Sequence, residues 1–232
     1  MTRRLFCFPH AGGQASSFAG WTGLAPDGLE IVPLEYRGRG VRYGESAYAN
    51  YDQAVQELAH AISADQAGGM PYGLFGHSMG ALLAFDVASV LARRGEAAPR
   101  CVFVSGRNPP HRASDAEQGE LDDGRLMHLL TEVGGVPDAL VSNGRFLKHY
   151  LGRFRDDLVM LRSRSTIESG VRLDCRIVVM HGEDDTAVAT AWLPEWARYS
   201  RAGHDVLAFP GGHFFLHEHP DRVLPAVAEA LT

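Results

Sequence analysis

The sequence predicts an α/β fold, with a mainly parallel, doubly wound sheet and one helical insertion. Short apolar runs typical of strands alternate with stretches of helical periodicity along most of the 232 residues, and crossover helices between parallel strands produce this alternation. The run at residues 175–180 is almost continuously apolar, as in a strand that helices cover on both faces. The alternation pauses at about residues 107–172. We therefore expect a single domain over residues 1–232 that carries a helical lid insertion there.

Composition limits the class of protein. Hydrophobic residues make up 45% of the chain and charged residues 22%, which is ordinary for a globular domain with one sizeable core. The formal net charge of −6 argues against nucleic acid or an anionic membrane as the main partner. No apolar run approaches the ~20 residues that span a bilayer.

The N-terminus and the cysteines predict a cytoplasmic protein. The first apolar run, which ends before Pro9, is too short for a signal peptide and indicates a first strand. Cys7, Cys101 and Cys175 each lie in a strand-like run and lack the spacing of a metal site. An odd number of such thiols predicts reduced structural residues.

The individual elements follow from local patterns of apolar residues, glycine and proline. We expect strands at residues 4–8, 29–36, 100–106, 175–180 and 205–209, and a further strand that ends at Gly76. We expect helices at residues 16–24, 51–67, 192–200 and 221–231, and one that follows Ser78 and ends near Arg93-Arg94-Gly95. Inside the insertion, helices are expected at residues 122–133, closed by Gly134-Gly135, and at residues 143–164, the second as one long helix or two. We expect these helices to form a mobile cap, with the Gly134-Gly135 break as its hinge.

The strongest functional signal is Gly76-His77-Ser78-Met79-Gly80, which joins an apolar strand to a helix. This order is typical of the nucleophile elbow of α/β-hydrolases. Small residues are needed two positions before and after Ser78, because a side chain there would collide with the neighbouring strand and helix. The turn would raise the hydroxyl of Ser78 above the sheet, at the free amides of a helix N-terminus.

Two further residues complete a predicted catalytic triad. A carboxylate and His213 follow Ser78 in the chain order of α/β-hydrolases, in loops after strand ends. Both Asp184 and Asp185 could orient the imidazole, and we favour Asp185 because it follows Gly182 by the spacing common in these loops. The other histidines near these motifs receive structural roles: His77 as packing under the elbow, and His181, His217 and His219 as loop or surface residues.

The loop after the first strand predicts the oxyanion hole. Its glycines, Gly12 and Gly13, allow the backbone to turn tightly at the edge of the sheet where Ser78 is expected. In hydrolases of this architecture one oxyanion amide comes from such a loop and the other from the residue after the nucleophile. We therefore expect the amides of Ala11 and Met79 in this role, with His10 as the neighbouring alternative to Ala11.

Two further features allow two interpretations each. The basic loop Arg37-Gly38-Arg39-Gly40-Val41-Arg42 either contacts an anionic group or forms structural ion pairs. The apolar stripe of the second cap helix either packs against the sheet or lines an acyl pocket in part. The stripe comprises Phe146, Leu147, Tyr150, Leu151, Phe154, Leu158 and Leu161.

Several motifs together resemble the type II thioesterases of polyketide and nonribosomal peptide biosynthesis. They are Phe8-Pro9-His10-Ala11-Gly12-Gly13, Tyr36-Arg37-Gly38-Arg39-Gly40, Gly76-His77-Ser78-Met79-Gly80-Ala81-Leu82-Leu83-Ala84-Phe85, Ser105-Gly106-Arg107 and Gly211-Gly212-His213-Phe214-Phe215. The cap resembles theirs at residues 129–137 and 154–158. The resemblance covers essentially the whole chain. Arg37 departs from the usual proline of that family and Val41 from its usual acidic residue.

The resemblance implies a stand-alone hydrolase that removes stalled or aberrant acyl groups from the phosphopantetheine arm of acyl or peptidyl carrier domains. The acyl thioester and the carrier domain would be its partners. We expect no metal and no organic cofactor, because phosphopantetheine is part of the substrate protein. A small-molecule carboxylesterase or lactonase with the same triad is the nearest alternative, and a non-catalytic binding protein on this scaffold is a third.

The resemblance also implies an acidic partner, since such carrier domains are typically acidic around the arm. Because the chain itself is net acidic, docking would need a local basic patch. The candidate residues are Arg37, Arg39, Arg42, Arg153, Arg155, Arg162 and Arg164. The alternative for the cap arginines is a solvated helix face with pairs to Asp156 and Asp157.

Overall fold

Six parallel strands form the centre of the molecule. The structure is a computed structural model that describes residues 2–112, 119–134, 144–164 and 171–232. The strands are β1 (Arg3–Phe8), β2 (Leu29–Pro33), β3 (Tyr72–His77), β4 (Cys101–Ser105), β5 (Arg176–Gly182) and β6 (His204–Phe209). They pair in the order β2-β1-β3-β4-β5-β6, every pair parallel. The predicted parallel sheet is confirmed.

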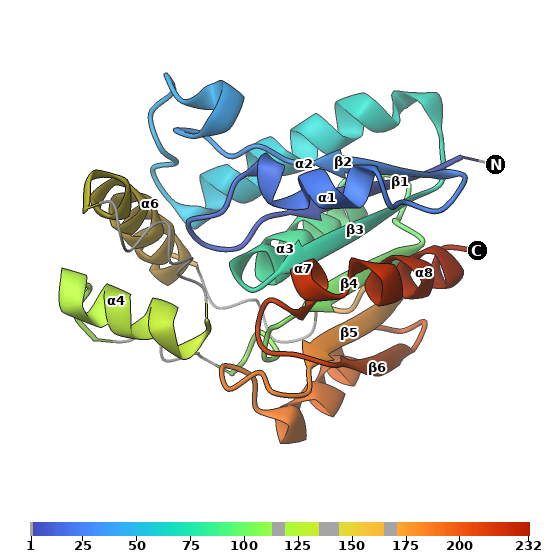
Figure 1. Cartoon of the computed structure of the whole chain (residues 1–232). Helices are drawn as coiled ribbons and strands as arrows, with labels where there is room; N and C mark the ends of the chain where they lie inside the picture. Colours follow the sequence, from blue (N-terminus) through green and yellow to red (C-terminus); the bar gives the residue numbers. More distant parts are fainter. Residues whose placement is uncertain (1, 113–118, 135–143, 165–170) are drawn as a thin grey trace.

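Helices cover both faces of this sheet (Figure 1), as a doubly wound fold requires. One face carries α2 (Tyr51–Asp65), α3 (Met79–Arg93) and the 3₁₀ helix η5 (Thr190–Tyr199). The other face carries α1 (Ala19–Thr22), α7 (Phe215–Glu218) and α8 (Pro220–Ala230). Short 3₁₀ turns complete the connections: η1 (Ala15–Phe18), η2 (Gly40–Arg42) and η3 (Gln66–Gly68). Each face has its own buried apolar cluster.

Proline explains the two main differences from the predicted elements. The strand expected at residues 29–36 ends at Pro33, which has no amide hydrogen to continue a ladder. The helix expected at residues 192–200 is a 3₁₀ helix with Pro194 inside it, and proline disfavours the bonding of an α-helix interior.

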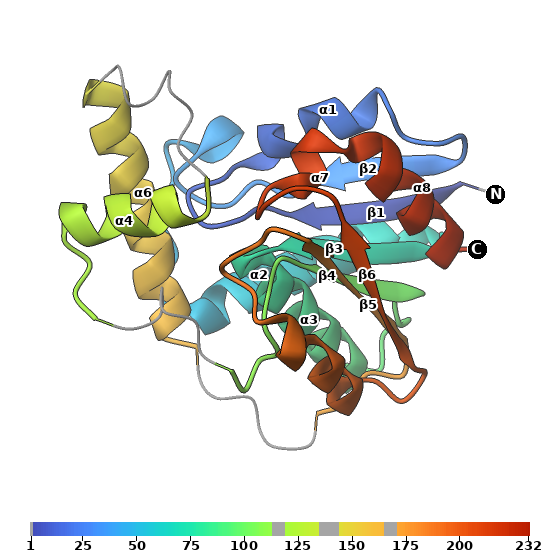
Figure 2. The same ribbon diagram turned by 60° about the horizontal axis from the view of Figure 1, so that its bottom comes forward.

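The insertion contributes two helices, α4 (Asp123–Glu132) and α6 (Gly144–Arg162), between β4 and β5. They lie beyond the carboxyl ends of the strands (Figure 2), the edge where α/β proteins bind ligands. The α6 helix is continuous, which settles the choice between one helix and two over residues 144–162. Gly135, half of the predicted Gly134-Gly135 break, lies outside the described residues.

Burial separates two parts of the predicted apolar stripe of α6. The stripe is buried from Tyr150 to Leu161, whereas Phe146 is 62% exposed. The expectation that Phe146 packs in the core is therefore wrong, because the first turns of α6 extend beyond the covered part of the sheet. No helix in the described ranges has both the length and the apolar character needed to cross a membrane.

The three cysteines are buried, and all have free thiols. Burial raises the pKa of Cys7, Cys101 and Cys175. A thiol with a raised pKa is a poor nucleophile. This agrees with the structural role that the sequence predicts for these residues.

Candidate active site

Ser78 lies in the turn between β3, which ends at His77, and α3, which begins at Met79. Its backbone angles are φ 55° and ψ −115°, and no other non-glycine residue of the described chain has a positive φ. Such a conformation costs on the order of 1–3 kcal/mol and persists only where the surroundings enforce it. Ser78 N donates to Ser105 O over 2.8 Å, so β4 holds the turn in place.

The glycines on either side of Ser78 are required by close backbone contacts. A Cβ atom on Gly76 would lie 2.0 Å from Gly80 O, and one on Gly80 would lie 2.2 Å from Phe8 O. No side-chain movement could relieve these overlaps, because the obstructing atoms belong to the backbone. The packing predicted for the elbow is therefore the packing observed.

A buried histidine–carboxylate pair lies at the same edge of the sheet. His213 Nδ1 is 2.8 Å from Asp185 Oδ2, and both side chains are buried. Asp185 Oδ1 accepts from Ala187 N over 3.0 Å, which orients the carboxylate. Asp184, the alternative carboxylate, is exposed. The structure thus brings Asp185 rather than Asp184 to His213.

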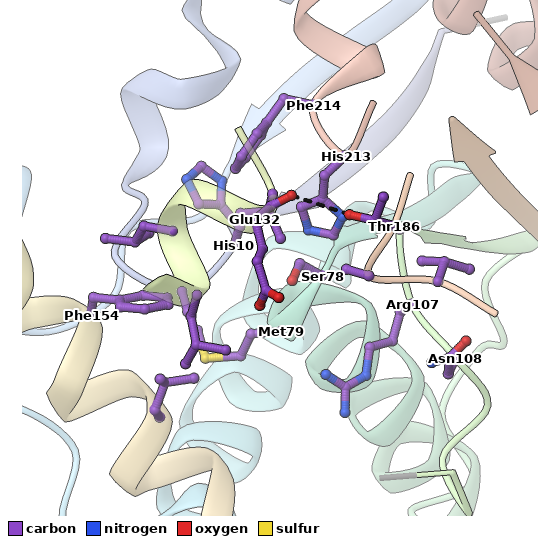
Figure 3. A pocket seen from close by; sticks show the side chains of 18 of the residues that line it. His10, Ser78, Met79, Arg107, Asn108, Glu132, Phe154, Thr186, His213 and Phe214 are labelled. Carbon is purple, nitrogen blue, oxygen red and sulfur yellow. Dashed lines mark hydrogen bonds between the residues drawn. The ribbon is translucent and has the colours of Figure 1, made fainter. Parts of the chain in front are cut away.

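Ser78 and His213 line one cavity, and Figure 3 shows their side chains next to each other. Because Nδ1 of His213 is engaged by Asp185, the other ring nitrogen, Nε2, is the one available to a hydroxyl. Carboxylate, imidazole and hydroxyl therefore follow one another in the order that nucleophilic catalysis needs.

Other histidines fill different environments. His77 is completely buried, and its Nδ1 lies 3.0 Å from Ser105 Oγ, consistent with the predicted packing role. Burial, followed by the charge of nearby His213, holds the pKa of His77 well below its usual value, so its ring stays neutral. The loop or surface role expected for His181 is wrong, because β5 extends to Gly182 and buries this residue.

The cavity has a volume of about 380 Å³, and residues from the sheet edge and from the insertion line it. Its apolar wall comes from α4 and α6: Leu129, Leu130, Tyr150, Phe154, Leu158 and Leu161. The stripe of α6 thus packs in the core and also lines the cavity, so both interpretations hold. Polar lining comes from Arg107, Asn108, Glu132 and Thr186 (Figure 3).

Several lining residues were not predicted from the sequence. Thr186 and Val188 directly follow Asp185, so their place in the chain was an available signal. Glu132 and Trp192 had no such signal. Glu132 ends a helix of the insertion, and Trp192 reaches the cavity from η5.

Ala11 and Met79 also line the cavity. Neither backbone amide has a hydrogen-bond acceptor among the described residues. The ring of His10 packs edge-on against Phe214, with 5.0 Å between centroids. Burial lowers the pKa of His10 to about 3 and so keeps its ring uncharged. Two unpaired amides beside Ser78 are the arrangement that an oxyanion hole requires.

The basic loop forms ion pairs within the protein. Arg39 is buried and pairs with Asp157 of α6, with 2.6 Å between Nη2 and Oδ1. Arg37 and Arg42 both pair with Glu57 of α2, Arg42 over 2.7 Å. The structural interpretation of this loop is therefore the one observed.

Two residues of the predicted basic docking patch are buried in ion pairs. Arg39 is 5% exposed, and Arg164, which pairs with Asp86 over 2.7 Å, is 8% exposed. Their proposed place on a docking surface is wrong, because both guanidinium groups are used inside the fold. Arg155 pairs with Asp123 of α4.

No cluster of three or more histidine, cysteine or acidic side chains suited to a metal ion occurs within residues 2–112, 119–134, 144–164 and 171–232.

Comparisons with known proteins place this geometry in a family. The model of the thioesterase domain family, described as "Thioesterase domain", matches residues 3–231. The gramicidin S biosynthesis protein GrsT of Aneurinibacillus migulanus is 30% identical over 229 residues, which are 98% of this chain and 88% of that protein.

Solved structures agree with the family match. The RedJ thioesterase of the prodiginine pathway of Streptomyces coelicolor has a TM-score of 0.86 and 31% identity, covering 99% of this chain and 93% of that one. The type II thioesterase BorB of the borrelidin cluster has a TM-score of 0.85 and 27% identity, covering 100% of this chain and 94% of that one.

Proposed function

This chain belongs to the thioesterase domain family and is a thioesterase, and we propose that it acts as a stand-alone type II enzyme on carrier domains. Its substrates would be stalled or aberrant acyl groups on the phosphopantetheine arm of acyl or peptidyl carrier domains. The observation that supports this proposal best is the strained Ser78 beside the His213–Asp185 pair in one acyl-sized cavity. The type II thioesterases among its relatives support the choice of substrate.

In the acylation step, Ser78 is the nucleophile. His213 takes the hydroxyl proton through Nε2 as the serine oxygen attacks the thioester carbonyl carbon. Asp185 accepts from Nδ1 over 2.8 Å, which fixes the tautomer and stabilises the imidazolium. The amides of Ala11 and Met79 donate to the tetrahedral oxyanion. The carbon–sulfur bond then breaks, and the pantetheine thiolate receives the proton from His213.

In the deacylation step, water repeats the attack on the acyl–Ser78 ester. His213 takes a proton from the water, and the same two amides hold the second oxyanion. The ester carbon–oxygen bond breaks, the acid leaves, and Ser78 regains its proton from His213. Every proton is returned, and no atom changes its oxidation state in this cycle.

The acyl group would occupy the part of the cavity under α4 and α6. Leu130, Phe154 and Leu161 offer an apolar wall, while Thr186 and Asn108 provide polar atoms on another side. Burial of an acyl chain against such a wall contributes about 0.8 kcal/mol for each methylene group. Binding energy of this kind would hold the chain while Ser78 reacts.

A direct comparison of substrates tests the proposal. We expect kcat/KM for acyl groups on intact carrier domains to exceed the value for acyl-coenzyme A and for matched p-nitrophenyl esters. A carrier domain that bears pantetheine but no acyl group should inhibit the reaction. Faster turnover of the small esters would favour the carboxylesterase or lactonase alternative. Binding of acyl carriers without hydrolysis would favour the non-catalytic one.

A further inference from the structure

A buried ion pair joins the loop after β2 to helix α6. Arg39 Nη2 lies 2.6 Å from Asp157 Oδ1, and Arg39 Nη1 lies 2.9 Å from Asp157 Oδ2, so the contact is bidentate. Both side chains are 5% exposed. The guanidinium also lies over the ring of Tyr36, 5.2 Å from its centroid. Burying two charges costs more than burying an apolar pair, so this contact points to a role besides stability.

Both partners of the pair also hold the loop at residues 9–13. Gly12 N donates to Asp157 Oδ2 over 2.7 Å, and Arg39 Nη1 donates to Gly13 O over 2.7 Å. Gly12 has a φ of +76°, and a Cβ added to it would lie 3.1 Å from Cζ of Tyr150. The side chains of Arg39, Asp157 and Tyr150 therefore enclose this turn.

The hydrogen bond from Gly12 N to Asp157 affects the position of Ala11, which lines the cavity with Ser78. Gly12 N belongs to the same planar peptide unit as the carbonyl of Ala11. Holding Gly12 N on a carboxylate thus fixes the peptide unit on one side of Ala11. The peptide unit on its other side carries the Ala11 N–H, and the carbonyl of this unit, His10 O, accepts from Gly13 N over 2.9 Å. The two contacts together set the direction of the Ala11 N–H. An oxyanion donor must lie about 2.7–3.1 Å from the anion, so a small rotation of this loop would remove it.

We propose that Arg39 and Asp157 are positioning residues that aim the Ala11 amide at the oxyanion. The inference rests on the proposed function, because it takes Ala11 as an oxyanion donor. Neither charged side chain is among the residues that line the cavity, so both act through the loop. Since Asp157 lies on α6, displacing this helix also removes the acceptor of Gly12 N. Seating of α6 and assembly of the oxyanion hole are therefore one event.

Two double variants separate positioning from stability. Arg39→Met/Asp157→Asn and Arg39→Met/Asp157→Leu both remove the charge pair and keep similar volumes, which avoids a lone buried charge. The amide oxygen of the asparagine in the first variant can still accept from Gly12 N, whereas a leucine side chain cannot. With a small acyl thioester, we expect the leucine variant to lose about 100-fold in kcat with little change in KM. The asparagine variant should lose only about tenfold in kcat, because it keeps the acceptor of Gly12 N and loses only the contact of Arg39 with Gly13 O.

A third variant provides a test that needs no loss of charge. Asp157→Glu keeps the pairing partner of Arg39 but moves the acceptor oxygens by the length of one C–C bond. We expect kcat to fall at least about tenfold while the melting temperature changes little. The exposed neighbour Asp156 supplies the control, since Asp156→Asn leaves the Gly12 contact intact.

The outcomes are distinguishable. Folded leucine and glutamate variants with wild-type kcat would overturn the proposal and leave the pair a purely structural contact. A rise in KM at constant kcat would also overturn it, since substrate binding rather than the oxyanion would then be affected. Wild-type enzyme that hydrolyses no acyl thioester would instead contradict the proposed function. A trifluoromethyl ketone analogue should lose affinity in parallel with kcat/KM if the oxyanion hole is the part affected.

Discussion

The elbow after β3 and the insertion between β4 and β5 form two sides of one cavity but are held in different ways. At the elbow, Gly76 and Gly80 pack backbone against backbone, and nearly every residue of α3 is buried. In the insertion, α4 buries only Leu126, Leu129 and Leu130. The side that carries the nucleophile is thus fixed by main-chain packing. The side that faces the acyl group depends on a few side chains.

Helix α6 itself divides into two parts. Residues 144–149 are exposed, apart from the half-buried Leu147. Among the described residues, the ion pairs and hydrogen bonds that join α6 to the sheet domain come from its second part and the turn after it. They include the contacts of Asp157 with Arg39, of Arg153 with Gln14 and of Arg164 with Asp86, and a bond from Tyr51 N to Ser163 Oγ over 2.9 Å. The predicted mobile lid therefore stays a prediction, narrowed to α4 and the start of α6.

The largest expected effect comes from removing the nucleophile. We expect Ser78→Ala to lower kcat for thioester hydrolysis by about 10⁶-fold, the loss seen when a serine protease loses its serine. The variant should fold as the wild type does, because alanine at this position leaves the backbone packing of the elbow unchanged. A serine-directed phosphonate followed by peptide mass spectrometry should label Ser78 in the wild type.

Ser89 provides a matched control on the same helix. It is buried, and its hydroxyl donates to Phe85 O over 2.9 Å, away from the cavity lining. Ser89→Ala should keep its activity and its labelling at Ser78. Full activity of Ser78→Ala, or labelling of another residue, would exclude Ser78 as the nucleophile.

The next largest effect distinguishes two adjacent carboxylates. Asp185→Asn should lower kcat by about 10⁴-fold, because an amide at this position favours the wrong imidazole tautomer. Asp184→Asn should lower it little, since Asp184 is exposed. Steady-state kinetics of the two variants with one thioester provide the measurement. A larger loss for Asp184→Asn would reverse the assignment.

The elbow side of the site could be predicted from sequence because its chemistry is local. Small residues beside Ser78, and Asp185 at a fixed distance from Gly182, are consequences of short-range backbone geometry. The parallel sheet was predictable for the same reason, since each strand is indicated by its own apolar run.

The insertion side could not be predicted to the same depth because its contacts are long-range. The partner of Arg39 is Asp157, 118 residues away, and no pattern near either residue indicates the other. The placement of Glu132 in the cavity likewise depends on how α4 packs against the sheet edge. Periodicity predicted the apolar stripe of α6 that lines the cavity in part, but not the polar contacts that these helices bring to the site.

Hydrogen exchange should reveal the contrast between the two regions directly. Amides of β3 and β5 are expected to exchange at least about 100-fold more slowly than those of α4 and of residues 145–149, because local opening costs less where few apolar contacts are lost. Amides from Phe154 to Leu161 should be intermediate, held by the Asp157 contact. Mass spectrometry of peptic peptides can resolve these segments. Equal protection of all of them would contradict a locally opening lid.

The smallest expected effect tests whether α6 unfolds with the sheet. Gly152 lies inside α6, and a Cβ added to it would meet no atom within 4 Å. Gly152→Ala should therefore stabilise the helix by about 0.5–1 kcal/mol, through its better helix propensity alone. If the start of α6 up to and including Gly152 opens independently of the sheet, its amides should exchange about two- to fivefold more slowly while the melting temperature stays the same. A rise in melting temperature of about 2–4 °C would instead mean that α6 and the sheet unfold together. In that case the two regions differ in packing but not in stability, and the lid prediction would fail.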